Sequence, residues 1–146
     1  MLRLMFLCTG NSCRSQMAEG WARKLGEEKG ENWLSVQSAG IEAHGKNPRA
    51  IAVMQEAGVD ISGQESTRVA DDMLEQADLV VTVCGHADEH CPVLPGNTRK
   101  IHWPLDDPAK AQGAEEAIMQ TFRNSRDDIR CRVEALLGEL KTESAS

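Results

Sequence analysis

Residues 2–25 read LRLMFLCTGNSCRSQMAEGWARKL. Nearly all of residues 2–7 are apolar, which predicts a buried strand that stops at Cys8. Apolar residues then recur at helical spacing over residues 17–25, and Gly26 is the expected end of this helix. A short loop containing Gly10 joins the two elements. The stretch therefore predicts a strand, a loop and a helix in that order.

The rest of the chain continues this alternation. We expect strands at residues 34–38, 78–84 and 100–103, a helix from Asn47 to Gly58, and a long helix from Gly113 onward with residues 142–146 as a frayed polar tail. The run at 78–84 is β-branched and apolar, which is typical of a central strand. The pattern predicts a doubly wound α/β fold, with a four-stranded, mainly parallel sheet and helices on both faces. We expect residues 1–146 to form one domain.

Composition limits the classes of function. The net charge is −7 and no basic tract is present, which argues against nucleic acid and anionic membranes as partners. The first apolar run is far too short for a signal or membrane-spanning segment. We therefore expect a cytoplasmic monomer. Its five cysteines are an odd number, and in a reducing compartment such cysteines favour catalysis or metal binding over structural disulfides.

The loop after the first strand has the form of an anion site, C-x5-R-S. A loop that opens a helix directs backbone N–H groups and the positive end of the helix dipole at one point, where an oxyanion can bind. Gly10 is expected to allow the turn that aims these groups, and the fork of Arg14 matches two oxygens of a tetrahedral anion. The thiolate of Cys8 should be favoured at the same focus. The predicted anion-binding residues are Thr9, Gly10, Asn11, Ser12, Cys13, Arg14 and Ser15.

Several stretches together carry a family resemblance. Residues 6–20, 38–42 and 78–82 and the Asp106-Asp107-Pro108 sequence resemble the thioredoxin-coupled arsenate reductases, which share the fold of low-molecular-weight protein tyrosine phosphatases. The resemblance covers residues 4 to about 137. It implies that Asp107, directly before proline, is the acid that protonates a departing oxygen. Read alone, this sequence would be an ordinary turn.

Two further cysteines distinguish a reductase from a phosphatase. Cys84 and Cys91 have the spacing C-x6-C, and Cys84 ends the predicted central strand. The resemblance implies a cascade in which Cys8 forms an adduct with arsenate, Cys84 attacks the Cys8 sulfur, and Cys91 then attacks Cys84. Thioredoxin would reduce the resulting Cys84–Cys91 disulfide. We expect residues 85–95 to change conformation during the cycle.

Other interpretations of the same residues remain open. A phosphatase needs Cys8, Arg14 and Asp107 without the cysteine pair, and a binding protein would hold phosphate or arsenate without chemistry. Zinc could bind Cys84, His86, His90 and Cys91, although this spacing fits no common structural zinc pattern. Glutathione with glutaredoxin is an alternative electron donor to thioredoxin. Cys131 is expected to be a surface thiol without a role.

A potassium site is the one departure from the family pattern. Asn11, Glu19 and Ser38 match three residues that hold potassium in some relatives, but Thr67 stands where an aspartate is expected. Potassium binding is therefore doubtful. We expect no tightly bound metal or cofactor.

Overall fold

The computed structural model describes residues 1–30, 32–85 and 98–145. Its strands are β1 (Leu2–Cys8), β2 (Leu34–Gly40), β3 (Leu79–Thr82) and β4 (Arg99–His102). Its helices are α1 (Arg14–Glu28), α2 (Pro48–Glu56), α3 (Asp71–Gln76) and α5 (Glu115–Ala145), with a short 3₁₀ helix at Pro108–Lys110. The expected alternation of strands and helices is confirmed over these residues. The short helix α3 was not expected from the sequence.

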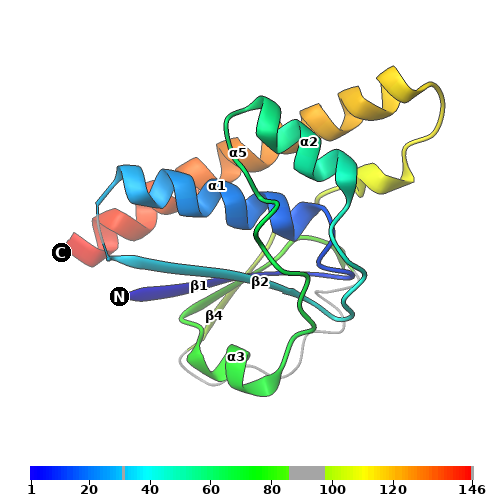
Figure 1. Cartoon of the computed structure of the whole chain (residues 1–146). Helices are drawn as coiled ribbons and strands as arrows, with labels where there is room; N and C mark the ends of the chain where they lie inside the picture. The colour runs from blue at the N-terminus through cyan, green and yellow to red at the C-terminus, as the bar shows by residue number, and fades with distance from the viewer. Residues whose placement is uncertain (31, 86–97, 146) are drawn as a thin grey trace.

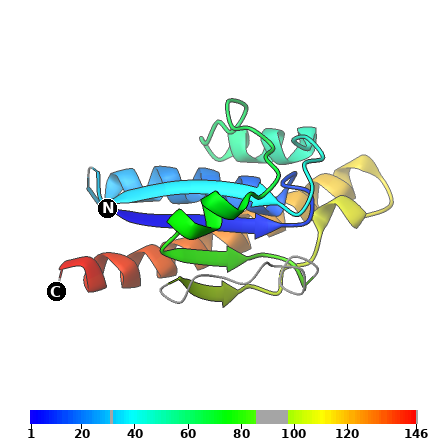
Figure 2. The same cartoon turned by 90° about the horizontal axis from the view of Figure 1, so that it is seen from below.

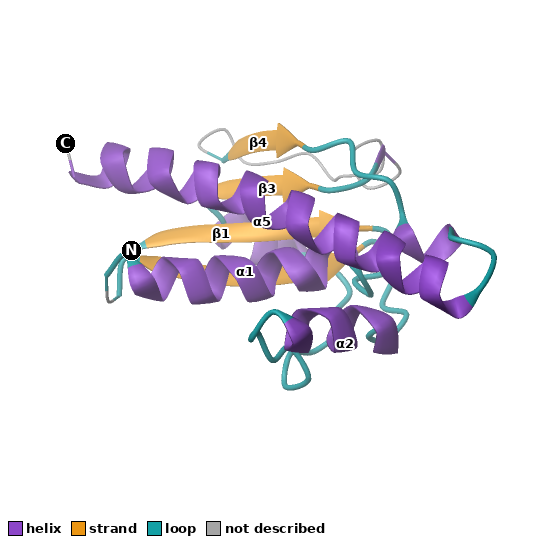
Figure 3. Cartoon of the chain, turned by 90° about the horizontal axis from the view of Figure 1, so that it is seen from above, coloured by secondary structure: helices purple, strands orange, loops and turns teal. Residues whose placement is uncertain are grey.

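The strands form one sheet in the order β2-β1-β3-β4, and each neighbouring pair is parallel. β1 and β3 are therefore the central strands, and both are almost wholly buried, in keeping with their continuous apolar runs. Helices α1, α2 and α5 lie on one side of the sheet, and α3 lies on the other (Figures 1, 2 and 3). The expected doubly wound α/β architecture is thus confirmed, although among the described residues most of the helix lies on one side.

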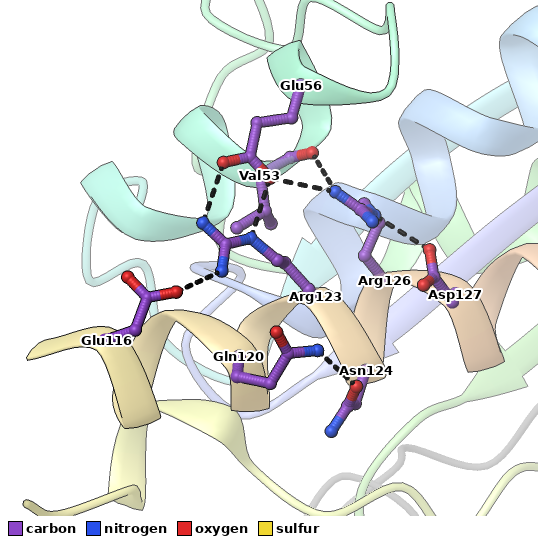
Figure 4. Close-up of polar contacts among 8 residues, drawn as sticks. All are labelled: Val53, Glu56, Glu116, Gln120, Arg123, Asn124, Arg126 and Asp127. Atoms are coloured by element: carbon purple, nitrogen blue, oxygen red, sulfur yellow. Dashed lines mark hydrogen bonds and ion pairs between the residues drawn. The ribbon is translucent and has the colours of Figure 1, made fainter.

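The core lies between the sheet and this helical layer. Trp21 of α1 and Phe122 and Ile129 of α5 are among its fully or nearly fully buried side chains. Trp21 and Trp33 are both buried packing groups. α5 is also tied to α2: Arg126 donates to the carbonyl of Val53, and Arg123 and Arg126 both pair with Glu56 (Figure 4).

Two expected helix ends are wrong. Gly26 does not end the first helix, because α1 continues to Glu28. Its missing side chain instead makes room for Leu34, whose Cδ2 would lie 2.9 Å from a Cβ on Gly26. The tail expected to fray from residue 142 is helical as far as Ala145, and the Thr142 hydroxyl donates to the carbonyl of Gly138. A glycine was misleading at the first place and local polarity at the second.

No described helix is both long and apolar enough to span a bilayer.

Candidate active site

The carboxyl edge of the sheet gathers the predicted site residues. β1 ends at Cys8, β3 is followed by Val83 and Cys84, and β4 leads through Trp103 to the segment that carries Asp107. A cavity of about 790 Å³ lies at this edge, and its lining includes Cys8, Arg14, Cys84 and Asp107. Parallel α/β sheets commonly bind ligands at this edge because the loops that follow neighbouring strands meet there. These four predicted site residues therefore lie around one cavity.

The shape of the anion loop is held from outside by main-chain hydrogen bonds. Carbonyl oxygens of Cys8, Thr9, Gly10 and Ser12 accept from backbone N–H groups of residues 41, 42, 44 and 47, at 2.8 to 3.1 Å. A trans peptide directs its N–H opposite to its carbonyl. With these carbonyls turned outward, the N–H groups of the same peptides face into the loop, where they suit a bound anion.

The turn within the loop is made by Asn11 and not by Gly10. Asn11 has φ of 49°, in the left-handed region that asparagine tolerates better than most residues. Gly10 is absent from the residues with positive φ, so the expected reason for this glycine is wrong. A Cβ at Gly10 would instead overlap the imidazole ring of His44. The glycine therefore lets His44 lie flat against the loop.

The sulfur of Cys8 is buried and hydrogen bonded from behind the loop. It lies 3.1 Å from the backbone nitrogen of Asn11, which donates to it, and 2.8 Å from the hydroxyl oxygen of Ser15. The side chains of Asn11 and Ser15 are fully buried and do not line the cavity. These two predicted anion-binding residues thus place their side chains against the nucleophile, while Thr9, Gly10, Ser12, Cys13 and Arg14 line the cavity.

Arg14 joins the loop to the segment that carries the predicted acid. Its Nη1 donates to the carbonyl of Leu105 at 2.9 Å, and its Nη2 lies 3.7 Å from Oδ2 of Asp107. Asp107 is partly exposed on the cavity wall, and its Oδ1 accepts from the backbone of Ala109. The carboxyl group therefore lines the same cavity as the anion loop, beside Arg14.

The other thiols of the chain differ in their surroundings. Cys84 is buried, and its sulfur lies 3.2 Å from the hydroxyl of Thr9, one residue from the nucleophile. Burial raises the pKa of Cys13 to about 12, so its side chain stays a thiol at neutral pH. Cys131 is exposed on α5, as expected. Cys91, His86 and His90 lie outside the described residues, as does most of the segment expected to move.

The polar atoms of the doubtful potassium site already form hydrogen bonds with one another and with neighbouring residues. Oδ1 of Asn11 accepts from the backbone of Thr67, and its Nδ2 donates to Ser15 and Ser38. Glu19 accepts from Ser38 through one oxygen and from Arg23 through the other. These atoms do not fit a potassium ion, because a guanidinium already supplies the positive charge. Among the described residues, no group of three or more histidine, cysteine or acidic side chains could hold a metal.

Sequence reasoning missed two residues that line the site and one contact within it. His44 and Lys110 line the cavity beside the loop, and Thr9 contacts Cys84. Contacts of this kind join residues far apart in the chain, up to 75 positions for Thr9 and Cys84. Nothing in the local spacing of the sequence signals them.

Comparison with known proteins fits this geometry. A family model described as low molecular weight phosphotyrosine protein phosphatase matches residues 3–146. The chain belongs to this family. Within it, the chain is 54% identical over 130 residues to an arsenate reductase of Halalkalibacterium halodurans, covering 89% of this chain and 91% of that one.

Solved structures related to this family member include both kinds of enzyme. An arsenate reductase in the phosphate-binding state is 36% identical, with a TM-score of 0.76, and the match covers 95% of this chain and 98% of the other. The YwlE arginine phosphatase from Geobacillus stearothermophilus is 25% identical, with a TM-score of 0.79 and coverage of 99% and 96%. The fold is thus shared by reductases and phosphatases, while the higher identities belong to reductases.

Proposed function

We propose that this chain is an arsenate reductase that uses Cys8 as its nucleophile and Cys84 as its second thiol. The observation that carries the proposal is the shared cavity: a thiol in an anion loop, an arginine, a carboxyl group and a second buried thiol line one space. A phosphatase would need only the first three of these groups. The identity of 50% or more to several arsenate reductases supports the same assignment.

The first step is attack by the Cys8 thiolate on arsenic. The Ser15 hydroxyl and the Asn11 N–H stabilise the thiolate by hydrogen bonding to it, and Arg14 and the inward N–H groups of the loop hold the arsenate oxygens. Asp107 gives a proton to the hydroxyl oxygen of hydrogen arsenate, which departs as water. A covalent bond between the Cys8 sulfur and arsenic remains.

Reduction occurs in the second step. Cys84 attacks the Cys8 sulfur, the sulfur–arsenic bond breaks, and arsenic keeps the electron pair and leaves as arsenite. A Cys8–Cys84 disulfide remains. The Thr9 hydroxyl, 3.2 Å from the Cys84 sulfur, can donate a hydrogen bond to the attacking thiolate. Cys91 then attacks Cys84, which releases Cys8 and leaves a Cys84–Cys91 disulfide.

The electron donor and the location of the protein belong to the same proposal. A disulfide between two cysteines of one chain suits a dithiol donor, so we assign thioredoxin in preference to glutathione with glutaredoxin. Free thiols at Cys8, Cys13 and Cys84 fit a reducing compartment, the cytoplasm. We take residues 1–146 as a single catalytic domain that acts as a monomer.

The cavity also favours a small anion over an aromatic phosphoester. None of the described residues that line it is a phenylalanine, tyrosine or tryptophan, and the residue after Asp107-Pro108 is Ala109. A tyrosyl phosphate would therefore find only the half-exposed imidazole of His44 beside it. Weak phosphatase activity on small phosphoesters is expected all the same, because Cys8, Arg14 and Asp107 serve both reactions.

The test separates the two reactions with one substitution. Cys84→Ser should abolish arsenate turnover with thioredoxin and thioredoxin reductase, measured as NADPH consumption, because no second thiol can release arsenite. Hydrolysis of para-nitrophenyl phosphate should be unchanged, since Cys84 takes no part in it. Cys131→Ser is the matched control and should leave both rates as they are. Retention of arsenate reduction in Cys84→Ser would refute the assignment of the second thiol.

A further inference from the structure

A chain of polar contacts links the exposed side of α1 to the nucleophile. It begins at Arg23, whose Nε and Nη2 lie 2.8 and 2.7 Å from Oε2 of Glu19. The other carboxylate oxygen of Glu19 accepts from the Ser38 hydroxyl at 2.6 Å. Ser38 in turn accepts from Nδ2 of Asn11 at 2.9 Å. Glu19 and Ser38 are buried, whereas about half of the Arg23 side chain is exposed.

The same Asn11 amide continues the contacts to the sulfur. Its Nδ2 also donates to the Ser15 hydroxyl at 2.8 Å, and this hydroxyl lies 2.8 Å from the sulfur of Cys8. The backbone of Thr67 donates to Oδ1 of Asn11 at 2.7 Å. A backbone N–H can only donate, so this contact fixes which end of the amide faces Ser15 and Ser38.

The direction of every hydrogen bond in this series of contacts follows from the ion pair of Arg23 and Glu19 at its outer end. A guanidinium can only donate and an ionised carboxylate can only accept, so Ser38 must give its hydrogen to Glu19. Ser38 is then left as an acceptor for Asn11. Because Asn11 donates to Ser15, the hydrogen of Ser15 is available for the Cys8 sulfur, which as a thiolate can only accept.

We propose that Arg23 is a positioning residue that, through Glu19, Ser38, Asn11 and Ser15, holds a hydrogen-bond donor on the nucleophilic sulfur and replaces a bound monovalent cation. A buried carboxylate without a cationic partner is unstable in the folded chain. Arg23 supplies that partner and is itself anchored, since its Nη2 also donates to the Val36 carbonyl at 2.9 Å. The proposal rests on the proposed function only in taking Cys8 as the nucleophile.

The surroundings of Arg23 show where a substitute cation could enter. Glu19, Arg23, Ser38 and Thr67 line a hollow of about 520 Å³ that shares no lining residue with the anion cavity. Removal of the guanidinium would expose the Glu19 carboxylate and the Ser38 hydroxyl to this hollow. Oxygen atoms of this kind are suitable ligands for a hard monovalent cation. Potassium should therefore bind the variant although its place is occupied in the natural chain.

The experiment measures the reactivity of Cys8 without arsenate. Cys8 is alkylated with iodoacetamide at neutral pH in choline chloride, and the modified peptide is quantified by mass spectrometry. Arg23→Gln should slow the reaction about tenfold, the lower end of the cost of losing an outer partner of a functional group. Arg23→Lys should react close to the natural rate, because it keeps the charge. Potassium chloride should restore Arg23→Gln and have no effect on the natural chain.

The matched control is Arg132→Gln, which removes another arginine paired four residues away, with Asp128 on α5, and should not change Cys8. An unchanged rate in Arg23→Gln, or a loss that neither lysine nor potassium reverses, overturns the proposal. If Arg23→Gln does not fold, potassium activation of the natural chain overturns it equally. Because alkylation needs no arsenate, failure of the reductase assignment would leave this result intact.

Discussion

The thiols that line the cavity differ in their hydrogen-bonding partners and therefore in their expected reactivity. Cys8 receives the Asn11 N–H and lies beside the Ser15 hydroxyl, and Cys84 lies beside Thr9. Cys13 also lines the cavity, but burial holds its pKa at about 12. A neutral thiol is a poor nucleophile. Cys13 is therefore not expected to compete with Cys84 for the arsenic adduct, even though it is only five residues from Cys8.

A substitution at Gly10 tests the contact with His44. Gly10→Ala should lower the free energy of unfolding by about 1–3 kcal/mol, because the added methyl group overlaps the imidazole ring. His44→Ala in the same chain should recover most of this loss, since it removes the overlapping ring. Urea unfolding of the two single variants and the double variant measures the coupling. Additive effects of the two substitutions would show that the ring is not the cause.

The identities of the reactive residues could be predicted from sequence, but their supporting contacts could not. Cys8 and Arg14 follow a spacing that has a chemical reason, Asp107 was implied by the family resemblance, and the structure brings the three together. Asn11 was expected to bind the anion or a cation; its amide instead orients Ser15 toward the sulfur. That role depends on Ser38 and Thr67, which tertiary folding alone brings near the loop.

Among the elements, the α2–α5 contact shows how helices of the outer layer are fixed. Arg123 and Arg126 converge on the Glu56 carboxylate, and Arg123 also reaches Glu116 (Figure 4). The pKa of Glu56 is lowered, mainly because Arg123 donates hydrogen bonds to its carboxylate. α2 follows the segment that holds the anion loop from outside, so this contact also supports the site indirectly.

The pH dependence of stability should report this contact. Because the pKa of Glu56 is lowered in the folded chain, its ion pairs stabilise the fold above the ordinary glutamate pKa and are lost as the pH falls through the folded value. Glu56→Gln should therefore lower Tm at neutral pH, with a difference from the natural chain that shrinks on acidification. Thermal unfolding of both proteins across acidic and neutral pH measures this. A difference that grows on acidification would have the wrong sign.

Element boundaries were the least predictable part of the fold. Strand positions followed from apolar runs and the start of α2 from its Asn47 cap, which accepts from the backbone of Arg49 as expected. Gly26 was taken as a helix end because glycine disfavours helices. The neighbouring β2 overrides this preference, since Leu34 packs where a side chain would be. Tertiary packing, invisible in a local window, decided that boundary.

For the whole molecule, one arginine connects the segments that meet at the carboxyl edge. Arg14 begins α1, donates to the carbonyl of Leu105 and lies near Asp107, so it links the loop after β1 to the segment after β4. A bound oxyanion would add further contacts to the same arginine. Occupation of the site should therefore stabilise the fold as a whole.

Thermal unfolding with inorganic phosphate tests this linkage. At phosphate concentrations about a hundredfold above Kd, Tm of the natural chain should rise by roughly 5–10 °C. Arg14→Lys should abolish most of this rise, because an ammonium group cannot grip two oxygens of the anion at once. Sulfate, another tetrahedral anion, should act like phosphate, and chloride at equal ionic strength should not. An equal rise in Arg14→Lys would place the bound anion elsewhere.

The backbone hydrogen bonds from residues 41–47 to the anion loop determine which substitutions this segment can tolerate. Because backbone N–H groups make these hydrogen bonds, most side chains of that segment can be substituted during evolution without a change in the shape of the anion loop. Proline at positions 41, 42 or 44 would remove one of those groups and is the replacement that selection should exclude. Gly40, directly before this segment, is constrained in its side chain, because a Cβ there would overlap the backbone of Glu42 and Asn11.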